Sequence, residues 1–149
     1  YHTRTAEAPM KNKSALPDAD WHAAFDGSCS PNPGRCRIAG VLRHLPTGAS
    51  FQWARNAGEG DSSDAEYQAL IALLQTLALH CLPGQSASIQ GDSQVVIQDV
   101  LGTAPRPAAV LSHYRNEARA ILAGFPDWQL RWVPRHRNQE ADQLLRQAG

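Results

Sequence analysis

The chain has 149 residues, a length that fits one domain. Hydrophobic residues make up 42% of it and charged residues 19%, which provides enough apolar material for a packed core and excludes a wholly disordered chain. The 14 basic residues balance the 14 acidic ones, so net charge gives no sign of a strongly basic polynucleotide-binding surface.

Membrane and secretory proteins are the next classes to be excluded. No window holds the roughly 18 apolar residues that a membrane helix needs, and the N-terminus lacks the apolar stretch of a secretory signal. We therefore expect a cytoplasmic protein, and no obligate protein partner is evident. The three cysteines, Cys29, Cys36 and Cys81, are odd in number and lie far apart, so we expect reduced thiols.

The first half of the chain has the pattern of a tail followed by strands. Residues 1–19 have no period, and we expect a disordered tail or an artificial or upstream extension, with a single domain at 20–149. Alternation predicts strands at about 21–26, 37–44 and 50–55, separated by the turn-rich run 27–34 and a tight turn. Residues 56–62 are polar and glycine-rich, and we expect them to lie outside the strands.

The second half alternates helices with strands. Apolar residues from Tyr67 to Cys81 recur at helical spacing, and Ser63 and Glu66 fit a capping box at the start of that helix. Further strands are expected at 86–91 and 128–132, and further helices at 92–101, 111–122 and 139–147. Asn138 can cap the last helix. Trp128 and Trp132 alternate along the last strand and could form a base-stacking platform, but a buried strand favours core packing for both.

This order predicts an α/β fold with one mixed five-stranded sheet. The first three strands, joined by short turns, would be antiparallel. The last two, reached through helical crossovers, would be parallel to the first, which would lie at the centre. Helices would cover both faces of the sheet.

Four acidic residues occupy positions where this fold can aim a side chain: Asp26, Glu66, Asp92 and Asp142. If the first strand is central, its neighbours bring these acids together. Crowded carboxylates oppose ionisation, so we expect at least one raised pKa. Oxygen ligands without a supporting His/Cys set favour Mg²⁺ or Mn²⁺ over zinc, and a pair of such ions can cleave a phosphodiester.

Three of these acids also have a purely structural interpretation. Asp92 could be an N-cap, Glu66 half of a capping box, and Asp142 a residue favoured by the helix dipole. Asp26 is different, because an acid in the middle of a buried strand is costly and needs a purpose.

The four acids lie in four motifs, in order: DGSCSPNPG at 26–34, DAEYQAL at 64–70, GDSQ at 91–94 and NQEADQL at 138–144. Their order and spacing resemble those of type 1 ribonuclease H over about residues 21–147. The resemblance implies a ribonuclease H-like fold and an endoribonuclease that hydrolyses the RNA strand of RNA/DNA hybrids. It also implies two Mg²⁺ ions, for which Mn²⁺ can substitute, and products with 5′-phosphate and 3′-hydroxyl ends.

The resemblance also assigns roles. Asp26 would bridge both metal ions, and Asp142 would hold the ion that activates water. Glu66 and Asp92 would hold the ion at the leaving oxygen, and Glu66 would also sense a ribose 2′-hydroxyl. His136 could assist product release, as a histidine in that loop does in many members, or could simply be solvent-exposed.

Substrate contacts are implied as well. The backbone near Cys29, together with Asn32 and Gln94, would touch the hybrid in its minor groove. Ser62 and Ser63 match positions next to a DNA phosphate pocket, but Asp61 stands where the family often has threonine. With no basic extra helix present, we expect weaker binding or a need for Mn²⁺. Two alternatives stay open: a silent nucleic-acid-binding module of this fold, and a nuclease for double-stranded RNA.

Overall fold

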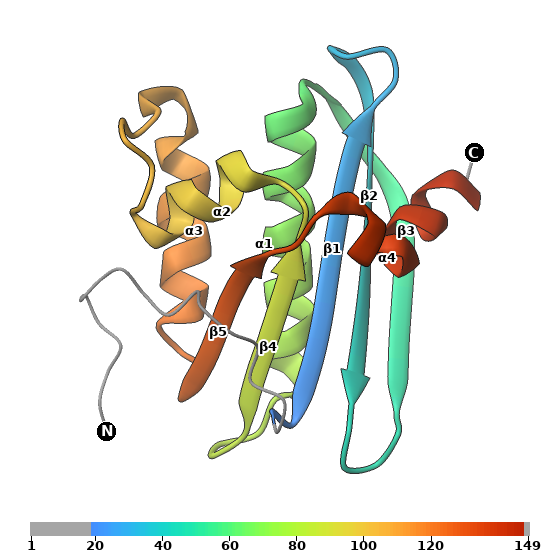
Figure 1. The fold of residues 1–149 in the computed structure, drawn as a ribbon, viewed down its shortest axis with the longest axis vertical. Helices are drawn as coiled ribbons and strands as arrows, with labels where there is room; N and C mark the ends of the chain where they lie inside the picture. Colours follow the sequence, from blue (N-terminus) through green and yellow to red (C-terminus); the bar gives the residue numbers. More distant parts are fainter. Residues whose placement is uncertain (1–18, 148–149) are drawn as a thin grey trace.

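A mixed five-stranded sheet forms the centre of the structure, a computed structural model that describes residues 19–147. The strand order is β3-β2-β1-β4-β5, so the first strand is central as predicted (Figure 1). β1 pairs antiparallel with β2 and parallel with β4, and β4 pairs parallel with β5. The strands are β1 (Trp21–Cys29), β2 (Gly34–His44), β3 (Ser50–Gly60), β4 (Ser86–Gly91) and β5 (Asp127–Trp132).

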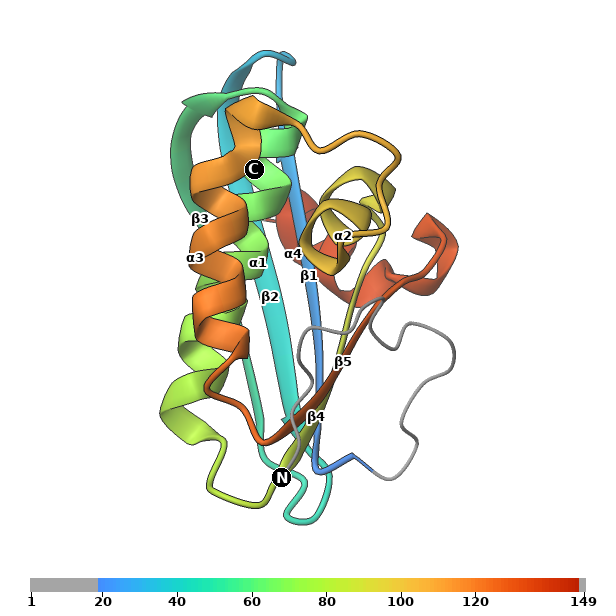
Figure 2. The ribbon, with the colours of Figure 1, turned by 90° about the vertical axis from the view of Figure 1, so that its left-hand side faces the viewer.

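Helices lie on both faces of the sheet, which confirms the predicted α/β architecture. In Figure 1, α1 lies behind the sheet and α4 crosses in front of it, and Figure 2 shows α3 alongside α1. None of the helices in this described part is long and apolar enough to cross a membrane. The helices are α1 (Ser62–His80), α2 (Gln94–Leu101), α3 (Ser112–Leu122) and α4 (Gln139–Gln147), with short 3₁₀ turns η1 (Ala109–Leu111) and η2 (Arg135–Arg137).

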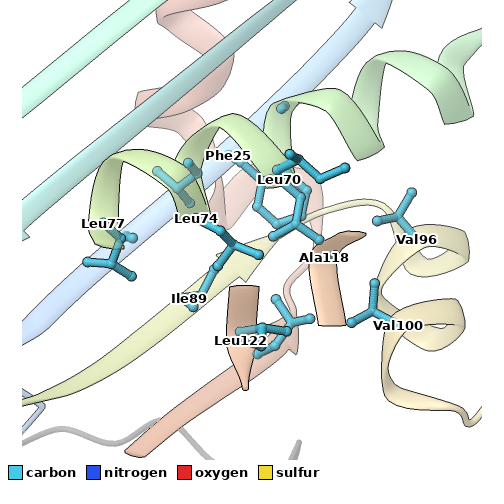
Figure 3. Packing of buried hydrophobic residues seen from close by; sticks show 14 of the residues in the cluster. Phe25, Leu70, Leu74, Leu77, Ile89, Val96, Val100, Ala118 and Leu122 are labelled. Atoms are coloured by element: carbon cyan, nitrogen blue, oxygen red, sulfur yellow. The ribbon is translucent and has the colours of Figure 1, made fainter. Parts of the chain in front are cut away.

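The core lies between the sheet and the helices α1, α2 and α3. Leu70 and Leu74 of α1 pack with Phe25 of β1 and Ile89 of β4, all fully buried (Figure 3). The same cluster extends to α2 and α3 through Val96, Val100, Ala118 and Leu122. This packing holds the side chains of β1 and β4 against α1.

A buried polar network joins the three helices on this face. The Tyr67 hydroxyl on α1 donates to Asp99 of α2 at 2.5 Å. Arg115 of α3 donates to the same carboxylate at 2.9 Å. Asp99 is only 4% exposed, yet both partners satisfy its charge.

Several element boundaries differ from the sequence prediction. β1 continues to Cys29 and β2 begins at Gly34, because the antiparallel pairing of the two strands goes on as far as Cys29 and Cys36, so part of the predicted turn at 27–34 is strand. β3 continues to Gly60, where it pairs with Gly34 across a register shift, so most of 56–62 is strand. The capping box of α1 is formed by Asp61 and Asp64, two residues earlier than the predicted pair Ser63 and Glu66. The cap of α2 is Ser93, whose hydroxyl accepts from the Val96 amide at 3.3 Å.

Two side-chain predictions are wrong. Cys29 and Cys36 form a disulfide, because the β1–β2 register places them directly opposite each other, with Cα atoms 4.1 Å apart. Cys81 remains a free thiol. Trp128 is buried as predicted, but Trp132, the last residue of β5, is 40% exposed. The predicted tail lies outside the described residues except for Ala19, which is buried.

Candidate active site

Three of the four predicted acids meet at the carboxyl end of the central strands. Asp26 lies on β1, Glu66 in the first turns of α1, and Asp92 directly after β4. One carboxylate oxygen from each lies within 4.8 Å of the others. The parallel pairing of β1 and β4 accounts for this, since parallel strands end at the same edge of a sheet.

The helix caps leave Glu66 and Asp92 available for the cluster. Asp61 and Asp64 cap α1, and Ser93 caps α2. The purely structural interpretations of Glu66 as half of a capping box and of Asp92 as an N-cap are therefore wrong.

Gly27 allows α1 to approach β1 closely enough to place Glu66. A Cβ at this position would collide with the carbonyl group of Ala65. The Gly27 amide donates to Glu66 Oε1 at 3.2 Å and to Asp26 Oδ1 at 3.0 Å. The glycine thus holds two of the three acids through one N–H group.

The fourth acid, Asp142, lies at the rim of this cluster. It is in the first turn of α4, and its side chain is 21% exposed and lies 3.2 Å from Arg146. Its charge is near enough to raise the pKa of Asp26, although it lies outside the group of three.

Asn138 connects α4 to the cluster and was not predicted to do so. Its side chain is buried, and Nδ2 donates to the backbone carbonyl of Phe25 at 2.9 Å, 113 residues away in sequence. A hydrogen bond from Asn138 also opposes the rise in the pKa of Asp92. Its side chain therefore does not cap α4. Its place in the motif at 138–144 was the only sequence signal for this role.

The electrostatics confirm the prediction of a raised pKa. Burial, reinforced by the charges of Asp92 and Asp142, raises the pKa of Asp26 to about 7. Burial and the charge of Asp26 raise the pKa of Glu66 to about 10. Burial also raises the pKa of Asp92, and Arg135 opposes that rise.

This donor set fits a hard divalent cation. The cluster consists of carboxylate oxygens alone, and such oxygens are the ligands that Mg²⁺ and Mn²⁺ prefer. Asp92 Oδ2 is buried without a hydrogen-bond partner among the described residues. An unpaired buried acceptor is costly, and a cation in the cluster would satisfy it.

The predicted substrate-contact residues lie at two places around the cluster. Asn32 Oδ1 accepts from the Ser62 amide at 3.1 Å, which ties the β1–β2 loop to the start of α1. Ser63 follows on the same helix, and Cys29 ends β1. Gln94 is exposed at the start of α2.

His136 is exposed on η2, between two arginines. It lines a cavity of about 270 Å³ together with Gln90 and Asn138. Within the part of the chain that the structure describes, it forms no ion pair with the four acids. Arg135 is instead the cation beside them, with Nε 3.9 Å from Asp92 Oδ2.

Comparisons with known proteins agree with this geometry. A family model described as "Reverse transcriptase-like" matches residues 24–148. Ribonuclease HI of Halobacterium salinarum is 35% identical over 127 residues, which are 85% of this chain and 63% of that protein. The chain therefore spans 63% of the length of this curated relative.

Solved structures show the same fold. RNase H1 from H. salinarum superposes with a TM-score of 0.77 at 34% identity, covering 86% of this chain and 96% of that one. The N-terminal RNase H domain of a Mycobacterium tuberculosis protein gives 0.75 at 26% identity, covering 85% and 96%. LC11-RNase H1, solved in complex with an RNA/DNA hybrid, gives 0.76 at 23% identity, covering 85% and 94%, which supports the fold alone.

Proposed function

This chain belongs to the type 1 ribonuclease H family, and on that premise we propose that it hydrolyses the RNA strand of RNA/DNA hybrids. The observation that carries the proposal is the convergence of Asp26, Glu66 and Asp92 within 4.8 Å. The relative of known activity is a ribonuclease HI, and a structure of the same fold was solved with such a hybrid.

The four acids would hold two divalent ions, Mg²⁺ or Mn²⁺. When bound, these ions supply an activated water and a stabilised leaving oxygen, which gives 5′-phosphate and 3′-hydroxyl ends. Asp26, whose pKa both Asp92 and Asp142 raise, would serve both ions. Glu66 and Asp92 would share one ion with it, and Asp142 of α4 would share the other. Asn138 fixes the backbone before Asp26.

The residues around the cluster would bind the hybrid. Glu66, held by the Gly27 amide, would accept a hydrogen bond from a ribose 2′-hydroxyl, the group that distinguishes RNA from DNA. We propose minor-groove contacts for Asn32, Gln94 and the backbone near Cys29. Ser62 and Ser63 would lie nearest to a phosphate of the DNA strand.

A labelled hybrid tests the proposal directly. Incubation with Mg²⁺, with Mn²⁺ or with EDTA should give RNA cleavage only in the presence of a metal ion. The cleaved RNA should be a substrate for 3′-end ligation without phosphatase treatment, because its 3′ end carries a hydroxyl. Absence of cleavage with both metals would contradict the proposal.

One observation keeps a second function under consideration. The start of α1 carries Asp61 and Asp64, and Asn32 and Asp61 already accept from two of its amide groups. Carboxylates at that position repel a DNA phosphate. Repulsion of this kind would weaken binding of the hybrid. Duplex RNA should be assayed beside the hybrid, because cleavage of duplex RNA alone would indicate a nuclease for double-stranded RNA. Tight hybrid binding without cleavage would instead indicate a binding module.

A further inference from the structure

Arg37 lies on the sheet face that carries Asp26. It is on β2 and pairs in register with Ser28 of β1, two residues beyond Asp26. Alternate residues of a strand share a face, and residues that pair in register point the same way, so all three project from one face. Arg43, six residues further along β2, donates to Glu140 of α4 at 2.7 Å. This face is therefore the one that α4 crosses in Figure 1.

The guanidinium of Arg37 is held in place, but its charge is not paired. The residue is only partly exposed, and Nη1 donates to Asn56 Oδ1 of β3 at 2.8 Å. Its Nε is buried without a hydrogen-bond partner among the described residues. In the same part of the chain Arg37 forms no ion pair, unlike Arg43 of the same strand, which pairs with Glu140. A partly buried cation without a counter-charge is costly, so a bound anion would stabilise it.

The acid cluster does not account for this cation. Arg135 is the arginine whose charge opposes the rise in the pKa of Asp26, Glu66 and Asp92. Strands rise about 3.3 Å per residue and lie about 4.8 Å apart, which puts the Cα atoms of Arg37 and Asp26 about 8 Å from each other. A nucleic-acid strand carries a phosphate about every 3.4 Å along its axis. The separation therefore corresponds to two or three nucleotides of one strand.

We propose that Arg37 binds a backbone phosphate of the RNA strand, within about three nucleotides of the phosphodiester that is cut. The inference rests on the proposed function, because the strand that is cut must lie over Asp26, on the face that Arg37 shares. The planar guanidinium offers several N–H donors to phosphate oxygens, and the bond to Asn56 orients it before the substrate binds. This contact fixes the register and affinity of the hybrid without reading its sequence.

The salt dependence of binding tests the contact against a matched control, Arg55→Ala. Arg55 is on β3, pairs in register with Ile38 of the core and lies over the Trp53 ring at 4.8 Å, so it projects from the other face of the sheet. In an Asp26→Asn background, we expect Arg37→Ala to weaken hybrid binding about tenfold. It should also lower the slope of log K against log salt by about one.

The control variant should keep both the affinity and the slope. Equal losses in Arg37→Ala and Arg55→Ala would overturn the proposal, because they would reflect net charge alone. In the chain that retains Asp26, Arg37→Ala should raise KM for the hybrid and leave kcat nearly unchanged. A loss confined to kcat would also overturn the proposal.

A chemical change in the substrate tests the same contact without relying on the fold of the Arg37 variant. Single RNA phosphates near the cut are replaced by uncharged methylphosphonates. At one position the Asp26→Asn chain should bind about tenfold more weakly, and addition of Arg37→Ala should cost little more, because both changes remove one interaction. Additive losses at every RNA position, or coupling with a DNA phosphate alone, would overturn the proposal.

The two proposals can fail separately. If the unsubstituted chain cuts the hybrid and Arg37→Ala binds and cuts it normally, the phosphate contact fails and the nuclease function stands. If the unsubstituted chain binds the hybrid through Arg37 but does not cut it, the nuclease function fails and the phosphate contact stands.

Discussion

Asp26 is buried in the sheet among other acids, which is costly for a metal-free protein. Its burial and the charges of Asp92 and Asp142 all favour the protonated form. No cation among the described residues forms an ion pair with Asp26, and Arg135 lies closer to Asp92. The negative charge of an ionised Asp26 is therefore not neutralised by these residues, and a bound divalent ion would neutralise it.

Replacement of Asp92 tests the cluster at the level of one residue. We expect Asp92→Asn to reduce cleavage by at least about 100-fold, because even outer-sphere changes at metal sites cost 10- to 100-fold. Folding should be retained, since Ser93 and not Asp92 caps α2. Circular dichroism and a hybrid cleavage assay measure the two effects, with exposed Glu117→Gln as the control. Loss of the fold would show that Asp92 is mainly structural.

Asn138 should act through the residues that it orients. We expect Asn138→Ala to lower cleavage by about 10- to 100-fold and to raise the Mg²⁺ concentration needed for half-maximal activity, because its bond to Phe25 fixes the strand next to Asp26. A Mg²⁺ titration of initial rates provides the measurement, with the exposed Asn116→Ala as control. An unchanged titration curve would contradict this positioning role.

The convergence of Asp26, Glu66 and Asp92 could be predicted from the sequence because each has a local sign, a strand parity or a place near a helix start. The contact of Asn138 with Phe25 could not, since it depends on which distant backbone lies opposite. Parity alone placed Trp132 in the core, but as the last residue of β5 it is 40% exposed. The Cys29–Cys36 bond depends in the same way on hairpin register.

At the scale of elements, the contact between β1 and α1 determines where Glu66 lies. We expect Gly27→Ala to push α1 away from β1, because its Cβ would overlap the Ala65 carbonyl group. Overpacking of this kind costs about 1–3 kcal/mol. Chemical denaturation should show that loss, and activity should fall further than the stability loss explains. Gly58→Ala is not a suitable control, because Gly58 has a positive φ that alanine would strain. The control is therefore Ala24→Ser, on the same strand as Gly27.

The polar network between α1, α2 and α3 should contribute to stability and leave the chemistry unchanged. Asp99→Ala would leave Arg115 and the Tyr67 hydroxyl without their carboxylate. Removal of one partner from a buried ion pair costs about 3–5 kcal/mol. Urea denaturation should show a loss of that size, while the folded fraction should cut the hybrid at the normal rate. A loss below about 1 kcal/mol would mean that water replaces the carboxylate.

The order of elements could be predicted well and their boundaries less well. Periodicity identified the strands and helices, and crossover rules gave the central position of β1. The extension of β3 to Gly60 was missed because glycine-rich sequence usually marks a loop, whereas here pairing with β2 continues across a register shift. The capping box predicted at Ser63 and Glu66 is wrong, because Asp61 and Asp64 cap α1 instead.

For the whole molecule, the raised pKa values make stability depend on pH. The pKa of Asp26 is about 7 in the folded protein against 3.8 ordinarily, and that of Glu66 about 10 against 4.5. Between the ordinary and the raised pKa values, the folded state thus binds more protons than the unfolded chain. The free energy of unfolding therefore falls as the pH rises from the ordinary values toward the raised ones. In EDTA we expect Tm to be several degrees lower at pH 8 than at pH 5.5.

Mg²⁺ should reverse this trend, since it binds the ionised carboxylates and displaces their protons. The rise in Tm on addition of Mg²⁺ should therefore be larger at pH 8 than at pH 5.5. Asp26→Asn should flatten the pH dependence in EDTA. Differential scanning fluorimetry across this pH range measures all three effects, and a Tm that is independent of both pH and Mg²⁺ would contradict the assignment of the cluster.

The bond between Asn138 and the Phe25 carbonyl spans 113 residues, and it has a consequence for partially made chains. Because residues from both ends of the chain form the site, the site cannot assemble until the last of them has been made and has packed against the first. A fragment that stops before residue 138 should therefore leave RNA intact, however well its sheet has begun to form.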